Sequence, residues 1–344
     1  MKKILSLFIV TLLMFSFATT AFATEDALDA SEDILVENGL PEENLDNLSD
    51  SVKEGLIEQM TNDPDSVDIV STVSDVDNLS EIENFLASSD EDLISMGANP
   101  SAITSSRKDL EVLSQKTDEQ IAAEKGVSIT EARYLLKAIK KGNERSKSGI
   151  IKSKNTNNVV TASGSISSSE MKYSQIISDY STNSQPYYGV ILTYTWNSVY
   201  ALAAFDDVIV SAWGGNLNTK SIVSLVDYHR WNYLSFTWSK FYKSTETSVE
   251  ETPNAGIEFK FPQSLSAPSI FSESPKTKCG TVAFRLYQTK RQGYDTKVIS
   301  TYCHRVISVS SASIGIDSSG AASVSLSIGG AWDKTSQKST TIAY

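Results

Sequence analysis

The side chains that could act in catalysis or bind a metal ion are few in this chain of 344 residues. It contains two histidines, His229 and His304, and each stands next to an arginine. Asp227 precedes His229 by two residues, which in a strand places both side chains on one face without defining a catalytic pair. The histidine and cysteine spacing does not match a zinc site, and no nucleophile elbow, phosphate-binding loop or calcium-binding loop occurs. The sequence therefore predicts a non-enzymatic protein without cofactor or metal, and a glycosidase that uses scattered carboxylates is the alternative.

Cys279 and Cys303 are the two cysteines of the chain, and we predict that they form a disulfide. The N-terminal lysines Lys2 and Lys3 and the apolar run after them have the pattern of an export signal. An even pair of cysteines in an exported protein is more often a disulfide than a metal or redox site. The two cysteines are 24 positions apart. Closing a loop of this length by a disulfide would stabilise the folded protein by about 3 kcal/mol, because it reduces the entropy of the unfolded chain. Two buried thiols are the alternative.

Aromatic residues gather in the second half of the chain, where all five tryptophans and 13 of the 14 tyrosines follow residue 160. A strand places Tyr194 and Trp196 on the same face, because they are two residues apart. Trp231 and Trp238 belong to a second aromatic group. On an exported β domain such rings could stack against sugars, so these four residues are the candidate ligand-facing aromatics. The alternative is that they serve the core or cross-strand pairs.

The most unusual stretch is a hairpin near the C-terminus that is almost free of charge. Between Arg305 and Lys334 the only charged residues are Asp317 and Asp333. Apolar residues alternate with serine and glycine, a pattern by which a strand can face lipid on one side and water on the other. The alternative is a hairpin that packs its apolar face on the protein core. The candidate membrane-facing residues are Ile314, Ile316, Ala322, Val324, Leu326 and Ile328.

The periodicity of apolar residues changes along the chain, from a spacing typical of helices to one typical of strands. From Val159 onward the apolar period falls from about 3.6 residues to two, which predicts an all-β domain over residues 170–344. Turn residues separate many short strands, which favours an antiparallel sandwich. We expect one short helix at its start, from Met171 to Tyr180.

Residues 24–142 are predicted to form an acidic helical arm. Between Thr24 and Pro100 there are 22 acidic residues against Lys53 alone, a net charge of -21, whereas the whole chain carries -12. Apolar residues recur at three- and four-residue spacing, as expected for helices. The chain as a whole is therefore predicted to be α+β, with an all-α arm before an all-β sandwich.

Residues 117–136 follow the spacing of a helix-turn-helix, with Ala122 four residues before Gly126. An exported protein with so acidic an arm would meet little DNA. The pattern arises wherever two helices cross closely, so we predict ordinary helix packing and no nucleic-acid partner.

The N-terminus has the features of an export signal. Lys2 and Lys3 precede an apolar run from Ile4 to Phe17, and Ala21 and Ala23 complete a small-x-small cleavage site. The run is shorter than the roughly 20 residues that a membrane-spanning helix needs. We therefore predict that residues 1–23 are a signal peptide cleaved after Ala23, and that the mature protein is secreted.

Residues 143–169 are polar, basic and poor in large apolar side chains, which is typical of a linker. Lys152 and Lys154 make this linker a candidate site for proteolytic processing. An uncut tether is the alternative.

The aromatic region also carries a resemblance. The run Tyr187-Tyr188, Tyr194-Thr195-Trp196-Asn197, Tyr200, Asp207-Val208 and Trp213 resembles the large secreted bacteriocins of the geobacillin type and related exported proteins of spore-forming Gram-positive bacteria. The resemblance implies antibacterial activity without an enzyme mechanism, and it implies no catalytic residue.

The expected function is that of a secreted, non-enzymatic effector. Its β domain would act on bacterial membranes or envelopes, and the acidic arm would contact it as a solubilising or inhibitory pro-region. The alternative is a binding module for cell-envelope polysaccharide.

Overall fold

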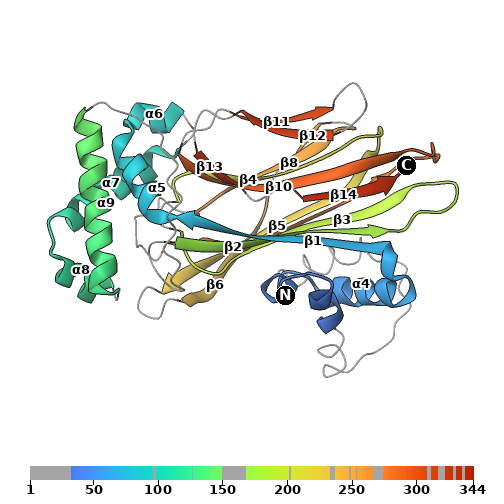
Figure 1. The fold of residues 1–344 in the computed structure, drawn as a ribbon, viewed down its shortest axis with the longest axis horizontal. Coiled ribbons are helices and arrows are strands. Elements are labelled where there is room, and N and C mark those ends of the chain that lie inside the picture. The colour runs from blue at the N-terminus through green and yellow to red at the C-terminus, as the bar shows by residue number, and fades with distance from the viewer. Residues whose placement is uncertain are drawn as a thin grey trace.

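The computed structural model describes residues 32–95, 98–125, 127–148, 168–200, 203–232, 237–247, 249–252, 254–265, 274–307, 311–316, 322–327, 331–334 and 338–344. The predicted signal peptide with Ala23, the processing candidates Lys152 and Lys154, and Ile328 of the hairpin lie outside these residues. The fold class is α+β, as predicted. A helical N-terminal region precedes two antiparallel sheets that pack as a sandwich (Figure 1).

The helices occupy the N-terminal region. A helical turn at residues 32–37 and a 3-10 turn at Pro64–Ser66 accompany α3 (Glu42–Leu45), α4 (Asp50–Asn62), α5 (Asn78–Ala87), α6 (Asp90–Ser95), α7 (Pro100–Ser114), α8 (Asp118–Lys125) and α9 (Ile129–Ser148). Within the described residues, no helix combines the length and the apolar character needed to cross a membrane.

Local capping explains where these helices begin. The Oδ1 atom of Asn99 accepts the N–H of Ser101 at 2.9 Å, and Pro100 occupies the first position of α7. Ser128 and Glu131 form a reciprocal capping box at the start of α9, with N···O distances of 3.0 and 3.1 Å. These helix starts are therefore determined by residues within a few positions of each other.

The strands follow in the order β1 (Val67–Asp77), β2 (Ser168–Asp179), β3 (Tyr187–Trp196), β4 (Asp206–Trp213), β5 (Asn218–Asn232), β6 (Thr237–Glu246), β7 (Val249–Thr252), β8 (Gly256–Pro262), β9 (Lys276–Tyr287), β10 (Asp295–Ile307), β11 (Ser311–Ile316), β12 (Ala322–Ser327), β13 (Ala331–Lys334) and β14 (Lys338–Ala343). Sheet A has the order β1-β2-β3-β9-β5-β6. Sheet B has the order β13-β10-β4-β8-β7, with β14 also pairing with β10.

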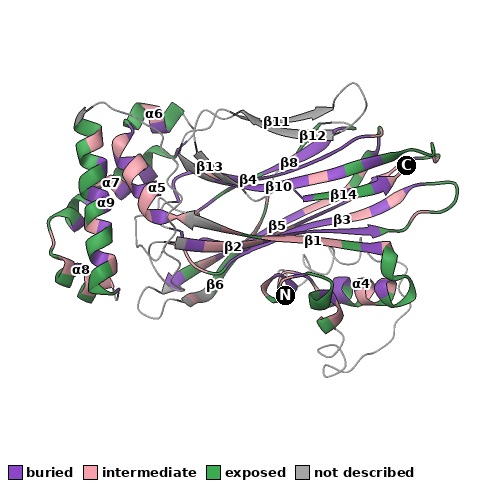
Figure 2. Cartoon of the chain, in the orientation of Figure 1, coloured by how far each residue is buried: buried purple, intermediate pink, exposed green. Residues whose placement is uncertain are grey.

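The main core lies between the two sheets. Sheet A contributes Tyr173, Tyr194 and Trp196, and sheet B contributes Trp213 and Tyr302, each at most 1% exposed. Figure 2 shows buried residues running along the strands of both sheets. The tyrosines and tryptophans concentrated in this half of the chain thus form its interior.

The expected helix from Met171 to Tyr180 is wrong, because this segment belongs to strand β2. Met171, Tyr173 and Ile177 face the core between the sheets, while Ile176 faces outward. Because Ile176 is also buried, the apolar spacing imitates a helix. A strand with both faces covered loses the simple alternation by which strands are identified.

The arm also supplies a strand that its helical pattern did not reveal. Strand β1 pairs antiparallel with β2 over eleven positions, from Val67 opposite Ser178 to Asp77 opposite Ser168. It forms one edge of sheet A. The arm and the β domain therefore share a sheet, which confirms the expected intramolecular contact between them.

The segment before β1 covers the outer face of sheet A. Its buried apolar side chains are Leu35, Leu40, Leu45, Leu48, Val52, Leu56 and Met60. They pack with Ile176 of β2, Ile191 of β3 and Ala283 of β9. Full burial of one such aliphatic side chain stabilises by about 1.5–3 kcal/mol, so the arm is held by a core of its own.

Helices α5 to α9 form a second helical cluster at one end of the sandwich (Figure 1). Ala204 and Phe205, between β3 and β4, insert into it, and the N–H of Asn99 donates to the carbonyl of Ala204 at 2.9 Å. Ile121 and Leu135 of the helix-turn-helix-like segment are 0% exposed. Helix packing accounts for that pattern, as predicted.

The uncharged C-terminal stretch forms the expected hairpin. β11 and β12 make a two-stranded sheet in which Ile314 lies opposite Val324 and Ile316 opposite Ala322. The hairpin lies against β4 and β10 (Figure 1). In this structure it is a third layer on sheet B.

Leu56→Ala tests whether the arm stabilises the β domain. Leu56 is 0% exposed, and a cavity at such a site costs about 2–5 kcal/mol of unfolding free energy. All five tryptophans lie in the β domain, so denaturant unfolding followed by tryptophan fluorescence reports that domain alone. We expect the tryptophan-detected midpoint to fall. Val36→Ala, at a 39% exposed position, should change stability by less than about 0.5 kcal/mol. An unchanged tryptophan transition in Leu56→Ala would show that the two parts unfold independently.

Candidate functional site

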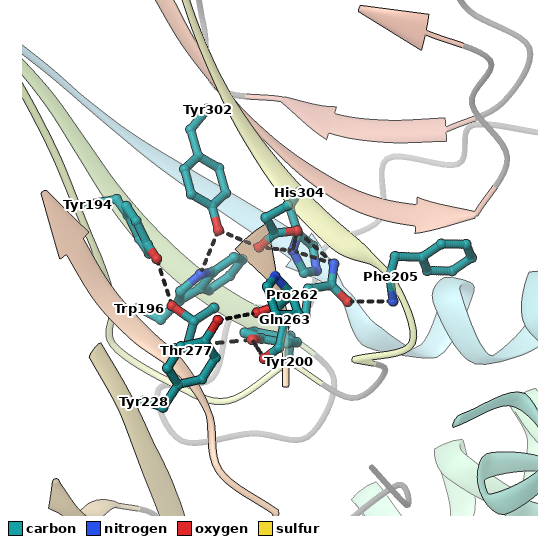
Figure 3. Close-up of polar contacts among 11 residues, drawn as sticks. Tyr194, Trp196, Tyr200, Phe205, Tyr228, Pro262, Gln263, Thr277, Tyr302 and His304 are labelled. Carbon is teal, nitrogen blue, oxygen red and sulfur yellow. Dashed lines mark hydrogen bonds and ion pairs between the residues drawn. The ribbon is translucent and has the colours of Figure 1, made fainter. Parts of the chain in front are cut away.

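A buried carboxylate organises a polar network between the two sheets (Figure 3). Asp207 of β4 is 0% exposed and accepts hydrogen bonds from Gln263 Nε2 at 2.6 Å and from the Tyr302 hydroxyl. His304 Nδ1 lies 2.9 Å from Asp207 Oδ1 and 3.1 Å from Oδ2. A buried charge is costly unless it is paired, and these three partners surround it.

Aromatic side chains enclose this network and link it to sheet A. Trp196 Nε1 donates to the Tyr302 hydroxyl at 3.2 Å. The rings of Trp196 and Tyr200 each lie 4.8 Å from the His304 ring. The Tyr200 hydroxyl donates to the carbonyl of Gln263 at 2.7 Å. The network therefore ties β3 of one sheet to β4 and β10 of the other.

The phenols of this region are held in their protonated form. Burial raises the pKa of Tyr194, Tyr200 and Tyr302 well above the usual value, and the negative charge of Asp207 raises it further. They act as hydrogen-bond donors across the physiological pH range.

The Asp207–His304 pair has the orientation in which a carboxylate positions a histidine for proton transfer. His304 Nε2, the atom that would face a substrate, is buried without a hydrogen-bond partner. A general base must come within hydrogen-bond reach of its substrate. His304 is 1% exposed and covered by two aromatic rings, so in this structure the pair links the neighbouring strands β4 and β10 of sheet B inside the core.

A buried lysine lies beside this network. Lys276 of β9 is 1% exposed, and its Nζ donates to the carbonyl of Tyr200 at 3.4 Å. Burial lowers the pKa of Lys276 to about 8, and the negative charge of Glu81 partly opposes this shift. Glu81 lies on α5 and is 3% exposed. The arm therefore supplies a charge that favours the ammonium form of a lysine inside the β domain.

The predicted disulfide between Cys279 and Cys303 does not form in the part of the chain that the structure describes. Cys279 is on the outer face of sheet A, since it alternates with the core residues of β9, and Cys303 is on the outer face of sheet B. Packed sheets lie about 10 Å apart, whereas a disulfide joins Cα atoms about 4.4–6.8 Å apart. Both are buried thiols, and burial raises the pKa of Cys279 to about 12.

The structure places the predicted ligand-facing aromatics mainly inside the fold. Tyr194 and Trp196 are 0% exposed and Trp231 is 4% exposed, so these rings are covered. Trp238 is partly buried against the core, and its Nε1 donates to the carbonyl of Trp196 at 2.8 Å. Their grouping in sequence reflected the core, which was the stated alternative.

Two aromatic residues that the sequence analysis did not select lie at the surface instead. Phe241 and Tyr242 of β6 are 51% and 48% exposed. No sequence pattern marked them, because neighbouring residues in a regular strand point to opposite faces. The register of β6 against β5 shifts here, with Tyr228 opposite Lys243 and His229 opposite Phe241, and such an irregularity re-aims side chains. β6 is the edge strand of sheet A opposite β1.

Basic and imidazole side chains on β5 accompany these two rings. The His229 ring packs edge-on against Phe241, with centroids 5.6 Å apart, and the Arg230 guanidinium lies 5.1 Å from the centre of the Tyr242 ring. Asp227, which precedes His229 by two residues, accepts a hydrogen bond from Ser244. We call the surface of His229, Arg230, Phe241 and Tyr242 the aromatic ribbon.

Among the described residues, no group of three or more histidine, cysteine, aspartate or glutamate side chains is arranged to hold a metal ion. The aromatic ribbon is a candidate site because its two aromatic rings are exposed and can reach an external ligand. Its exposed rings and guanidinium suit stacking and electrostatic contact.

Comparison with known proteins gives structural matches of low similarity. No protein-family model and no curated protein sequence matches the chain. A collagen-binding domain from a Staphylococcus aureus adhesin matches at 7% identity and a TM-score of 0.23, over 49% of this chain and 95% of the other. The C-terminal domain of the Streptococcus pyogenes antigen I/II-family protein AspA matches at 10% identity and a TM-score of 0.26, over 50% and 53% of the two chains.

A third match is the KRT10-binding region domain of the pneumococcal serine-rich repeat protein PsrP, at 12% identity and a TM-score of 0.19, over 39% of this chain and 76% of the other. At this level of similarity the matches transfer neither a site nor a ligand. None of these three proteins is a bacteriocin, so they give the predicted bacteriocin resemblance no support.

Asp207→Asn tests the network between the sheets. The asparagine amide would direct N–H groups toward Gln263, Tyr302 or His304, which now donate to the carboxylate. We expect the free energy of unfolding to fall by about 3 kcal/mol, because buried donors would lose their acceptor. Urea unfolding measures the change. Asp206→Asn is the matched control, because Asp206 is partly exposed and lies 3.7 Å from Lys260, and its loss should cost less than about 1 kcal/mol. Equal effects of the two substitutions would contradict a structural role of Asp207.

Lys276→Met tests the burial of the lysine through pH. The folded-state pKa of about 8 is below that of an unfolded lysine, near 10.5, so the unfolded chain binds more protons between these values. The stability of the native protein should rise with pH in this window. Measured from pH 8 to pH 9, the free energy of unfolding should gain about 1 kcal/mol relative to Lys276→Met. Parallel pH profiles for the two proteins would show that Lys276 titrates as an exposed lysine.

Proposed function

We propose that the protein is a secreted, non-enzymatic binding protein of the bacterial cell envelope, and that the aromatic ribbon binds an envelope polysaccharide. The observation that carries the proposal is the exposure of Phe241 and Tyr242 on an edge strand, next to buried aromatic residues of β5, Tyr228 and Trp231. Exposed apolar side chains that gather in one place commonly mark an interaction site. The flat faces of the two rings offer stacking surfaces for the C–H faces of sugar rings.

The polar partners of these rings support a saccharide ligand. Arg230 next to Tyr242 provides guanidinium N–H groups beside an aromatic face, and His229 provides ring nitrogens beside Phe241. A polysaccharide presents hydroxyl groups and apolar ring faces together, so it can use both kinds of contact. Secretion is part of the proposal and is supported by the cationic, apolar and small-residue pattern of residues 1–23.

The hypothesis of membrane activity rests on the charge split, the basic linker and the uncharged C-terminal hairpin, and only the hairpin offers a mechanism. In this structure β11 and β12 lie against β4 and β10, and the outward-facing Val208 and Val210 of β4 are at most 4% exposed. The hairpin would have to leave this position before it entered a bilayer. We therefore favour envelope binding, which needs no rearrangement of the fold.

The double substitution Phe241→Ala and Tyr242→Ala tests the ribbon. Binding of the full chain to purified Gram-positive cell-wall polysaccharide, measured by co-sedimentation over a concentration series, should weaken at least about tenfold. The circular dichroism spectrum and unfolding midpoint should change little, because both rings are exposed.

Tyr294→Ala is the matched control, since Tyr294 is a 64% exposed tyrosine outside the ribbon, and it should bind like the native protein. Equal binding by the native protein and the double variant would remove the ribbon as the site. Failure of the native protein to bind any wall fraction, together with dye release from liposomes, would favour the membrane reading.

A further inference from the structure

We propose that the arm and the β domain remain one folded unit after the chain is cut between them, so that a chain processed within residues 149–167 is a two-chain complex. The arm would act as a permanent strand donor and cover for sheet A rather than as a pro-region that leaves. Three separate sets of contacts carry this proposal, and each joins residues that precede the cut to residues that follow it.

The first set is the shared sheet. Every position of β1, from Val67 to Asp77, has a partner on β2. Thr340 of β14 also donates through Oγ1 to Asp68 Oδ2 at 2.6 Å, which ties the same strand to sheet B. Without the arm, β2 would become an edge strand with a row of unpaired N–H and C=O groups.

The second set is a group of buried and partly buried hydrogen bonds on the outer face of sheet A. Asn47 Nδ2 donates to Thr195 Oγ1 at 2.7 Å, to Thr193 Oγ1 at 3.1 Å and to the carbonyl of Tyr194 at 3.1 Å. Asn44 Nδ2 donates to Ser174 Oγ at 2.8 Å. Hydroxyl groups on two strands, β2 and β3, thus meet side-chain amide groups from the arm, and both sides would lose hydrogen-bond partners if they separated.

A carbonyl contact completes this set from the other direction. Thr281 Oγ1 donates to the carbonyl of Asn47 at 3.2 Å, and Thr195 Oγ1 donates to the carbonyl of Glu43 at 3.0 Å. Lys172 forms an ion pair with Glu43. The short segment from Glu43 to Asn47 therefore contacts sheet A through both its side chains and its carbonyl groups. A loosely attached acidic tail would not make such specific contacts.

The third set is apolar and lies at both ends of the arm. Ile176, Ile191 and Ala283 of the outer face are at most 5% exposed because the arm covers them. At the other end, Phe205 inserts among the helices α5 to α9 and is 2% exposed. Domains move relative to each other unless their interface is large and apolar. The interface between the arm and the β domain is apolar at these two places.

Cutting the full chain tests the proposal. A recognition sequence for a site-specific protease replaces part of residues 149–167, and the purified protein is cut to completion and applied to size-exclusion chromatography with mass analysis of the peak. We expect both fragments in one peak at the elution volume of the uncut protein, and separate peaks only in denaturant. Separate elution under native conditions, or precipitation of the β domain after cutting, would overturn the proposal.

The native thiol under the arm provides a second measurement. Cys279 is 7% exposed on the covered face of sheet A, close enough to Asp46 for that charge to contribute to its raised pKa. In a Cys303→Ser background, its reaction with a thiol reagent should be as slow in the cut protein as in the uncut one. An acceleration of at least about tenfold on cutting would show that the arm leaves.

Leu56→Asp provides a matched variant that weakens the interface without touching the β domain. A carboxylate at this 0% exposed position should release the arm from the cut protein and expose Cys279. The uncut Leu56→Asp chain is compared in parallel, because tethering raises the local concentration of the arm. If the cut Leu56→Asp protein kept its arm as firmly as the native one, the buried face of α4 would not be what holds it.

Discussion

The structure depends on a sheet that is buried on both faces. Sheet A buries Tyr173, Tyr194 and Trp196 against sheet B, and it buries Ile176 and Ile191 against the arm. A two-layer sandwich covers only the inner faces of its sheets. The outer face of sheet A therefore needs a third layer, and the segment of residues 32–62 supplies it. The strongly acidic N-terminal region is for this reason a structural part of the fold, and most of the acidic side chains in this segment are exposed.

A second constraint is the burial of charge where the two sheets and the helical cluster meet. The carboxylate of Asp207 lies among three hydrogen-bond donors, and Lys276 lies close enough to Glu81 of α5 to be influenced by its charge. Such groups are tolerated only where the surrounding geometry is well defined, because a displaced partner leaves a charge in a medium of low polarity. They make the relative position of the layers specific, while the apolar core provides most of the stability.

The aromatic residues show how burial separates structural from functional side chains of the same type. Trp196 and Tyr194 look suited to sugar stacking when the sequence alone is considered, yet they have no exposed surface. Phe241 and Tyr242 are exposed on the edge strand β6, where a register shift against β5 interrupts the regular alternation of faces. The distinction rests on the position of the strand in the sheet, which is set by pairing with β5 through a register that shifts at His229.

The sequence by itself determined the features that arise from neighbouring residues. The change of apolar period after residue 159 established a helical region followed by a β-sandwich, and residues such as Asn99 with Pro100 and Ser128 with Glu131 set helix starts through contacts within three positions. Other features depend on which distant segment of the chain buries a residue, and only the tertiary structure shows this. Ile176 is buried by the arm, which made β2 resemble a helix, and Cys279 and Cys303 lie on opposite outer faces, which separates them despite their even number. The physical reason is that periodicity records how many faces of an element are buried but not what buries them, and here the covering residues come from more than 100 positions away.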